Sequence, residues 1–273
     1  AIDQHTDGVL LAGDIFNTRR LLADDAAILR NEVQRYRDAT GNPVIGIDGN
    51  HDDNEGGWLE LLGVETFSDF RPVITIGNHH IMGFNYCRPE LFFERLEAAA
   101  TYCREEQIRP SVCLLHYPLG DMAPLFGVPE LTTDILGPRL YEMGVSYAAM
   151  GDIHDYQEAN NCGVNFVYPG SIELTDISEK LPKSVVMLEL PEQPGAGVTY
   201  QTRAVLRGVV ETEEDYTAFV EQVRLVRDQL PVVEVKINAD LPDAHARLCR
   251  ELHGLPCSIT RIPKQVASQA WNK

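Results

Sequence analysis

Four apolar, strand-like runs in this 273-residue chain each end in a short polar segment. The runs lie at 9–12, 44–47, 112–115 and 145–150, and the polar segments lie at 13–17, 49–52, 115–118 and 151–154. Apolar runs bounded by turn residues are typical of buried strands. In an open α/β sheet the carboxyl ends of the strands share one edge, and ligands bind there. The pattern therefore predicts an α/β fold whose polar side chains converge at one edge.

The polar segments carry side chains that bind metal ions. The candidate ligands are Asp14, Asn50, His116, Asp152 and His154. Oxygen and imidazole donors suit Mn²⁺, Mg²⁺ or Fe²⁺. The alternative is a plain turn in which Asn50 and Asp52 cap the backbone, for which a Gly-Asn pair is well suited. Four segments in order favour the metal centre.

The order of the segments resembles the calcineurin-like metallophosphoesterases. That family's pattern runs Asp-x-His, Gly-Asp-x-x-Asp/Asn, Gly-Asn-His-Asp/Glu, His and Gly-His-x-His. Tyr-Pro-Gly-Ser at 168–171 further resembles the segment that follows the last metal motif in SbcD-type DNA nucleases. The resemblance covers roughly residues 7–260. It implies a layered metallophosphoesterase β-sandwich flanked by helices, with a small α+β capping domain.

The resemblance also implies a centre of two divalent metal ions, with Mn²⁺ as the expected ion and Mg²⁺ as the alternative. Asp14 would bridge the two ions, and His154 would bind one of them. The other ion would be held by Asn50, His116 and Asp152. Such a pair of ions can lower the pKa of a shared water and clamp the oxygens of a phosphodiester.

Two further residues receive catalytic roles from the same resemblance. His51 would stand beside the scissile phosphate, where it stabilises or protonates the transition state. Asp52, its neighbour, is available to orient the His51 ring. The expected chemistry is hydrolysis of a phosphodiester.

The chain departs from the family pattern in two places. Asp152 stands where the family has His, which adds one negative charge to a site that still suits a hard divalent ion. The opening Asp-x-His is missing, because Asp3 and His5 match its letters but Asp14 follows only eleven residues after Asp3. Neighbouring parallel strands need a crossover of about a dozen residues or more. We therefore expect a first strand and helix upstream of Ala1.

Periodicity and turn residues predict the organisation of the chain. The expected domains are a nuclease domain at 1–191 and a capping, DNA-binding domain at 198–273, joined by a Pro- and Gly-containing linker at 192–197. The first domain should contain helices at 24–40 and 90–105 and closing strands at 166–168 and 185–190. The second should contain strands at 198–205, 232–237 and 259–262, a helix opened by a capping box at Thr212, and a helix at 243–253.

The net charge of −18 is unusual for a DNA enzyme, because phosphate binding depends on Lys and Arg. Ten basic and ten acidic residues cancel within 199–273, so the whole deficit lies in 1–198. We therefore expect a partner protein to supply part of the DNA-binding contacts. The candidate phosphate contacts are Arg203, Arg207, Arg247 and Arg250, with Arg261 and Lys264 as further candidates. For each of them, a solvated surface side chain is the alternative.

Cysteine usage and hydropathy indicate the compartment. Six cysteines without a paired framework are interpreted as reduced core residues of a cytoplasmic protein: Cys87, Cys103, Cys113, Cys162, Cys249 and Cys257. No apolar run approaches the ~20 residues of a membrane helix, so no membrane partner is expected.

Together these features predict a metal-dependent DNA exonuclease or endonuclease, nucleoid-associated and encoded by a bacterium or phage. The resemblance implies action on DNA ends, an SbcC-like SMC-family ATPase as partner, and a homodimer. One alternative is a small-nucleotide phosphodiesterase or phosphomonoesterase of the same fold, against which the capping region and Tyr-Pro-Gly-Ser argue. Another is a scaffold that has lost catalysis, which the missing first motif supports.

Overall fold

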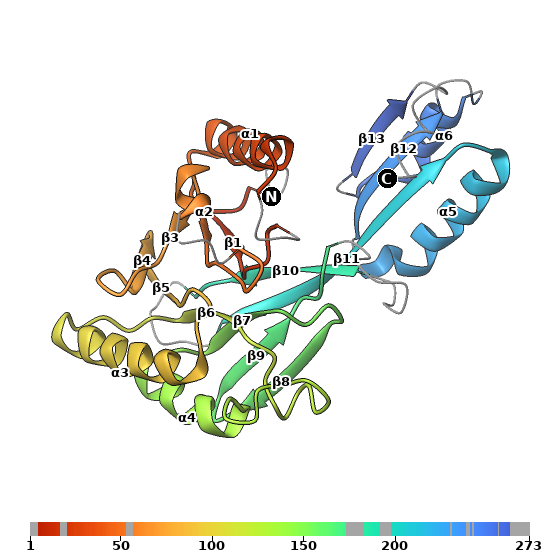
Figure 1. Ribbon diagram of the computed structural model, residues 1–273. Helices are drawn as coiled ribbons and strands as arrows, with labels where there is room; N and C mark the ends of the chain where they lie inside the picture. Colours follow the sequence, from red (N-terminus) through yellow and green to blue (C-terminus); the bar gives the residue numbers. More distant parts are fainter. Residues whose placement is uncertain are drawn as a thin grey trace. The chain divides into compact units, whose positions relative to one another are not determined.

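The chain is divided by its internal contacts into two compact units (Figure 1). The computed structural model describes residues 5–16, 21–52, 57–172, 183–191, 198–229, 231–238, 241, 243–255 and 257–262. The first unit comprises Ala1–Gly170 and Leu188–Tyr200, and the second comprises Ser171–Met187 and Gln201–Lys273. The predicted linker at 192–197 lies outside the described residues, so the boundaries predicted at 191 and 198 stay a prediction.

A three-stranded parallel sheet opens the first unit. Its strands are β1 (Val9–Leu11), β2 (Val44–Gly46) and β3 (Glu65–Thr66), in that order, with helices α1 (Ala23–Thr40) and α2 (Trp58–Leu61) between them. Val33 and Tyr36 of α1 are buried against Val44 in the core of this part. The helix ends at Gly41, whose φ of 75° lets the chain turn back into β2. The helix predicted at 24–40 is confirmed.

A six-stranded sheet forms the rest of the first unit. Its strands are β4 (Val73–Ile76), β5 (His79–Gly83), β6 (Val112–His116), β7 (Tyr147–Gly151), β8 (Gln157–Asn161) and β9 (Val164–Tyr168). The spatial order is β4-β5-β6-β7-β9-β8, with β5, β6, β7 and β9 parallel and the two edge strands antiparallel to their neighbours. His116 and Gly151 are therefore paired at the carboxyl ends of two adjacent strands.

Helices α3 (Pro89–Glu105) and α4 (Thr133–Met143) lie on one face of this sheet (Figure 1). Phe92 of α3 and Leu136 of α4 share a core with Leu115 of β6. The preceding residue of β6, Leu114, points to the opposite face of the sheet and is buried as well. The sheet is thus covered on both sides, as in the predicted layered fold, and the helix predicted at 90–105 is confirmed.

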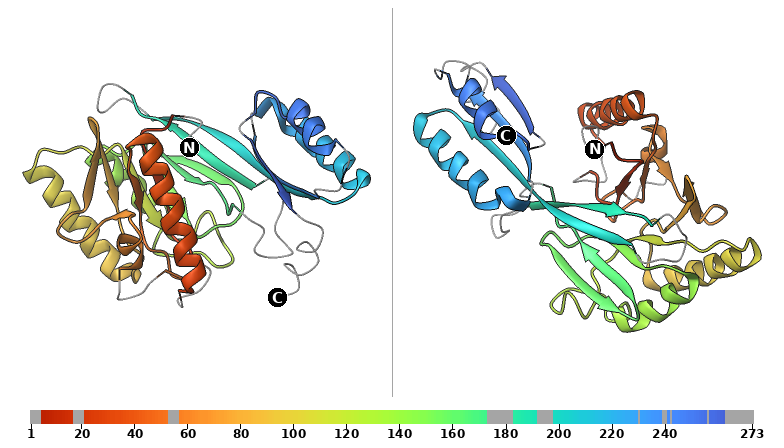
Figure 2. Two further views of the ribbon diagram at one scale, coloured as in Figure 1. Left: turned by 90° about the horizontal axis from the view of Figure 1, so that it is seen from above. Right: turned by 180° about the vertical axis from the view of Figure 1, so that it is seen from behind.

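The second unit contains most of a sheet of order β10-β11-β12-β13, of which residues 188–189 and 199–200 are assigned to the first unit. Its elements are β10 (Lys183–Glu189), β11 (Thr199–Val210), α5 (Glu213–Val226), the 3₁₀ turn η2 (Arg227–Gln229), β12 (Val232–Asn238), α6 (Ala244–Glu251) and β13 (Cys257–Ile262). Strands β11, β12 and β13 run parallel, and α5 and α6 lie side by side on one face of them (Figure 2). The predicted capping box at Thr212 is present.

Two strand predictions in this region can be compared with the structure. The strand predicted at 198–205 continues to Val210, because Leu206 and Val210 keep the alternation and bury their side chains beneath the helices. The strand predicted at 185–190 corresponds to β10, which pairs with β11 and is divided between the units, with its residues up to Met187 in the second unit and those from Leu188 in the first. The apolar pattern identifies a strand but does not identify its partner.

The expectations drawn from cysteine usage and hydropathy can be compared with the structure. Cys87, Cys103 and Cys113 are buried or half-buried, but Cys162, Cys249 and Cys257 are exposed, so the interpretation of the set as core residues is wrong for these three. Cys162 lies in the turn between β8 and β9, with a φ of 51°. Of the helices in the described part of the chain, none combines the length and apolar character needed to cross a bilayer.

The core of the six-stranded sheet predicts a large stability difference between two phenylalanines. Phe92 is fully buried and packs edge-on against Phe84 with ring centroids 5.3 Å apart, whereas Phe70 is 96% exposed. We expect Phe92→Ala to lower the free energy of unfolding by ~3–5 kcal/mol. Phe70→Ala, the matched control, should change it by less than ~0.5 kcal/mol. Urea unfolding measures both, and equal losses would contradict the packing described above.

Candidate metal centre

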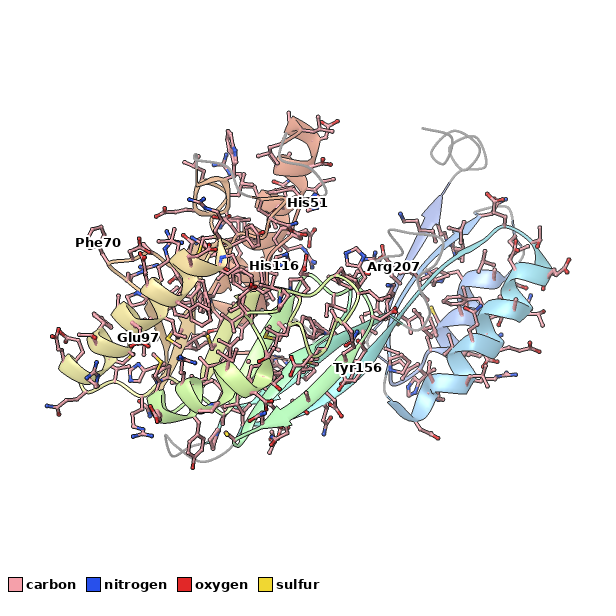
Figure 3. The ribbon with its side chains drawn as sticks, turned by 60° about the horizontal axis from the view of Figure 1, so that its bottom comes forward. His51, Phe70, Glu97, His116, Tyr156 and Arg207 are labelled. Atoms are coloured by element: carbon pink, nitrogen blue, oxygen red, sulfur yellow. The ribbon has the colours of Figure 1, made fainter. Side chains whose placement is uncertain are left out.

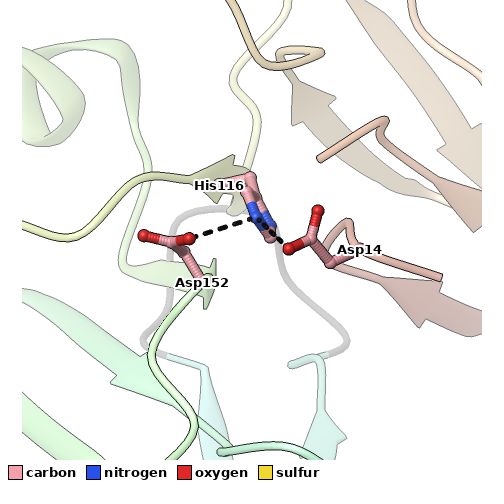
Figure 4. A group of neighbouring side chains, drawn as sticks. All are labelled: Asp14, His116 and Asp152. Atoms are coloured by element: carbon pink, nitrogen blue, oxygen red, sulfur yellow. Dashed lines mark ion pairs between the residues drawn. The ribbon is translucent and has the colours of Figure 1, made fainter. Parts of the chain in front are cut away.

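The His116 ring joins the two sheets of the first unit. It lies at the end of β6, is 1% exposed, and its Nδ1 is 2.6 Å from the carbonyl oxygen of Ala12, just after β1. A neutral imidazole carries one N–H, so a ring that donates from Nδ1 offers the lone pair of Nε2. That Nε2 atom faces Asp14 Oδ2 at 3.4 Å and Asp152 Oδ1 at 3.6 Å (Figure 4).

Both carboxylates stand on backbone in the left-handed region. Asp14 has a φ of 51° and Asp152 a φ of 86°. Such conformations cost about 1–3 kcal/mol for residues other than glycine and are concentrated at functional sites. Asp and Asn tolerate them better than other residues because their short polar side chains bond locally. The local strain turns each carboxylate toward His116.

Two glycines permit this close approach. A Cβ atom on Gly151 would overlap the Ala12 carbonyl and the His116 ring, and a Cβ on Gly49 would overlap the Asp14 carboxylate. The segments after β1, β2, β6 and β7 therefore meet with no room for a side chain between them. The Gly residues that precede the polar residues in the sequence were the signal for this contact.

Asn50 completes the group. Its side-chain oxygen lies 3.0 Å from each Asp14 carboxylate oxygen and 3.3 Å from His116 Nε2. With the amide reversed, the nitrogen would instead donate to Asp14 from the same position. The orientation with the oxygen inward places four ligand atoms around one point, from Asp14, Asn50, His116 and Asp152. Acceptors that face each other repel, so a cation bound there would stabilise this orientation, whereas the reversed amide satisfies Asp14 and His116 without one.

The charges of the group favour a cation. Burial opposes ionisation of Asp14, but the hydrogen bond and charge of His116 hold the pKa of Asp14 below its ordinary value. Burial raises the pKa of Asp152. Burial also disfavours a charged His116, yet the hydrogen bond and charge of Asp14, the Ala12 carbonyl and the charge of Asp152 together outweigh it and raise the pKa of the ring. The lowered pKa of Asp14 keeps a negative charge in the centre, which a cation would balance.

The donor set fits a divalent metal ion. Ligand atoms of Asp14, His116 and Asp152 lie within 4.8 Å of one another. Two carboxylates carry two negative charges, which a divalent cation would balance. Oxygen donors with one imidazole, and no thiolate, suit ions of the Mg²⁺, Mn²⁺ and Fe²⁺ type.

The remaining predicted site residues lie in different surroundings. His51, labelled in Figure 3, is an exposed residue, and its backbone N–H donates to Asp14 Oδ1 at 2.9 Å. His154 is exposed on the loop after β7 and is not one of the three grouped ligands. The Tyr-Pro-Gly-Ser loop lies against that segment, because a Cβ on Gly170 would come within 2.8 Å of the His154 carbonyl oxygen.

The structure gives Asp52 a different role from the predicted one. Its side chain is buried and accepts hydrogen bonds from the backbone N–H groups of Ile15 at 3.0 Å, Phe16 at 2.8 Å and Gly49 at 3.1 Å. These bonds hold the loop after β1 against the loop after β2. The capping alternative therefore describes Asp52, and the expectation that it orients the His51 ring is corrected.

Two of the predicted phosphate contacts, Arg207 and Arg247, form ion pairs within the second unit. Arg207 pairs with Glu234 at 2.9 Å across β11 and β12. Arg247 pairs with Glu213 at 2.7 Å and stacks over the Tyr216 ring, with its guanidinium carbon 3.8 Å from the ring centroid. The other predicted contacts are Arg203, which is half-buried, Arg250 and Arg261, which are exposed, and Lys264, which lies outside the described residues.

Comparison with known proteins gives distant relatives. No family model matches the chain. A protein of Bacillus subtilis named "Uncharacterized metallophosphoesterase YhaO" is 26% identical over 199 residues, which are 70% of this chain and 47% of that protein. "DNA double-strand break repair protein Mre11" of Methanosarcina mazei is 27% identical over 222 residues, which are 75% of this chain and 32% of that protein.

The names of these relatives support the metallophosphoesterase superfamily. The chain spans about a third to a half of the length of the two relatives. Among solved structures, the phosphopantetheinyl hydrolase PptH of Mycobacterium tuberculosis is similar over 60% of this chain and 78% of its own, with 17% identity and a TM-score of 0.39. The metallophosphoesterases depend on metal ions, in agreement with the group around His116.

Metal binding by this group can be tested with a matched pair of histidines. Residues that only orient a metal ligand contribute up to about 100-fold to metal affinity. His116 would contact the ion directly, so we expect His116→Ala to weaken Mn²⁺ binding by more than that. The control is His79→Ala, because His79 begins β5 and is not one of the grouped ligands. Titration calorimetry measures both, and Mn²⁺ binding by the His116 variant at wild-type strength would contradict the site.

Proposed function

We propose that this chain is a divalent-metal-dependent DNA phosphodiesterase that acts on DNA ends with an SMC-family ATPase, as a homodimer. The observation that carries the proposal is the convergence of Asp14, Asn50, His116 and Asp152 at one point. Phosphoesterase chemistry is supported by the similarity to a relative that is named a metallophosphoesterase. DNA as substrate is supported by the repair name of the other.

In this proposal, one metal ion would be held by the four converging residues Asp14, Asn50, His116 and Asp152. Mn²⁺ is the expected ion and Mg²⁺ the alternative, because both accept carboxylate and amide oxygens. His154 would serve a second ion. A bound divalent ion supplies Lewis-acid neutralisation of the charge on a phosphodiester.

The residues around that centre would position the substrate and move a proton. His51 would be the catalytic group, because its backbone N–H is bonded to Asp14 while the residue is exposed, so that a phosphodiester can reach it. A protonated His51 ring can donate to the leaving alkoxide. Asp52 would keep the two loops together and would not touch the substrate.

A second candidate is a phosphodiesterase that acts on a small nucleotide. It is favoured by the ion pairs of Arg207 and Arg247, which engage two of the arginines expected to bind DNA phosphates. A catalytically reduced scaffold is the third candidate, and it is favoured by the position of His154 apart from the grouped ligands.

The role of His51 is tested by separating metal binding from hydrolysis. In the full-length protein, His51→Ala should retain Mn²⁺ and lose about 10²–10⁴-fold in DNA hydrolysis, the usual contribution of general acid catalysis. The measurements are calorimetry for the metal and cleavage of a labelled duplex for the activity. Near wild-type cleavage would remove His51 from the mechanism, and loss of both metal and activity would assign it to the metal centre.

The choice between DNA and a small phosphodiester is tested on helix α6, which carries both Arg247 and Arg250. Arg250→Ala should weaken duplex binding and reduce the dependence of log K on log salt by about one unit. Hydrolysis of a small chromogenic phosphodiester should stay unchanged.

Arg247→Ala is the matched control on the same helix. It breaks the pairing with Glu213 and the stacking on Tyr216, so it should lower the unfolding temperature. Its duplex affinity should fall less than that of Arg250→Ala. If neither variant altered duplex binding, the small-nucleotide candidate would be preferred.

A further inference from the structure

Tyr168 fastens the loop that follows the metal ligand His116. It ends β9 and is fully buried. Its hydroxyl donates to the Tyr117 carbonyl oxygen at 2.7 Å and accepts from the Leu119 N–H at 3.0 Å. Both partners are backbone groups, one and three residues after His116. One side chain therefore satisfies two buried backbone groups beside the ligand.

Tyr117 forms a second connection of the same kind. Its hydroxyl donates to the Cys87 carbonyl oxygen at 2.8 Å and accepts from the Cys87 N–H at 3.1 Å. Its side chain is almost fully buried, and its ring packs on that of Tyr86 with centroids 5.4 Å apart. Tyr117 thus connects the loop of His116 to the segment that follows β5.

That segment in turn holds the loop of Asn50. The Tyr86 N–H donates to the Asp48 carbonyl oxygen at 2.8 Å, and Asn85 Oδ1 accepts from the Asp48 N–H at 3.0 Å. The Tyr86 ring also stands edge-on to the His116 ring, with centroids 6.3 Å apart. Hydrogen bonds and the backbone between them thus connect Tyr168, at the end of β9, to Asp48, two residues before Asn50.

We propose that Tyr168 and Tyr117 are positioning residues, which set the distance between the metal ligands His116 and Asn50. The inference rests on the proposed function and extends it to two side chains that do not reach the metal. Loss of the Tyr168 hydroxyl would leave the Leu119 N–H and the Tyr117 carbonyl buried without a partner, so the loop would shift to recover hydrogen bonds. Burial raises the pKa of both hydroxyls, which keeps them protonated as donors.

A tyrosine elsewhere in the same sheet separates positioning from ordinary stability. Tyr147, on β7, is 2% exposed, and its ring packs against Tyr200 at 5.2 Å between centroids. No described residue hydrogen-bonds to its hydroxyl. Tyr147→Phe therefore removes a buried hydroxyl without releasing a ligand loop, and it is the matched control for Tyr168→Phe.

The experiment is calorimetric titration of the wild type, Tyr168→Phe and Tyr147→Phe with Mn²⁺ alone. Residues that orient metal ligands are typically worth 10–100-fold in metal affinity, and we expect a loss of about that size for Tyr168→Phe only. Exchange of the Leu119 amide hydrogen should accelerate in the same variant. The unfolding temperature without metal reports any general destabilisation.

Wild-type Mn²⁺ affinity in Tyr168→Phe together with a lower unfolding temperature would overturn the inference, since the hydroxyl would then serve stability alone. Equal affinity losses in Tyr168→Phe and Tyr147→Phe would overturn it as well. If Tyr168→Phe does not fold, Tyr117→Phe is measured instead, with the same expected loss and the same overturning result. Mn²⁺ binding that follows the expected pattern without any phosphoester hydrolysis would reject the proposed function and leave the inference standing.

Discussion

The hydrogen bond between His116 Nδ1 and the Ala12 carbonyl is the contact on which the centre depends. It joins the end of β6 in the six-stranded sheet to the end of β1 in the three-stranded sheet, over 2.6 Å. Ala12 lies two residues before Asp14, so the same bond sets both the direction of the ring and its distance from the carboxylate. The tautomer that it selects turns the Nε2 lone pair to the side where the acidic residues converge.

Much of the fold and of the centre could be predicted from the sequence. Apolar periodicity gave the helices that became α1 and α3, because a helix must bury one stripe of side chains whatever its partners are. The repeated change from an apolar run to a polar segment located Asp14, Asn50, His116 and Asp152. Parallel strands bring their carboxyl ends to one edge, so local patterns were enough to predict a long-range convergence.

Contacts between distant segments could not be predicted in the same way. Asp52 follows His51 in the chain, which suggested a pair, but its carboxylate binds backbone amides 36 and 37 residues earlier. Arg207 was predicted to contact phosphate, but it pairs with Glu234. That partner could not be foreseen because the register of β11 and β12, which places Glu234 opposite Arg207, cannot be derived from the sequence pattern. Side-chain partners across a fold depend on three-dimensional packing, which composition and spacing do not encode.

The left-handed backbone of Asp14 and Asp152 limits which residues can replace them. Valine, isoleucine and threonine are excluded because a branched Cβ clashes with the backbone at positive φ. Asparagine and glycine adopt this conformation readily, so they would preserve the shape of the loops while removing the negative charge. The substitutions that the backbone tolerates best are thus ones that remove a carboxylate from the candidate metal centre. Folding and ligand chemistry at these two positions thus impose separate requirements, and a change that meets the first need not meet the second.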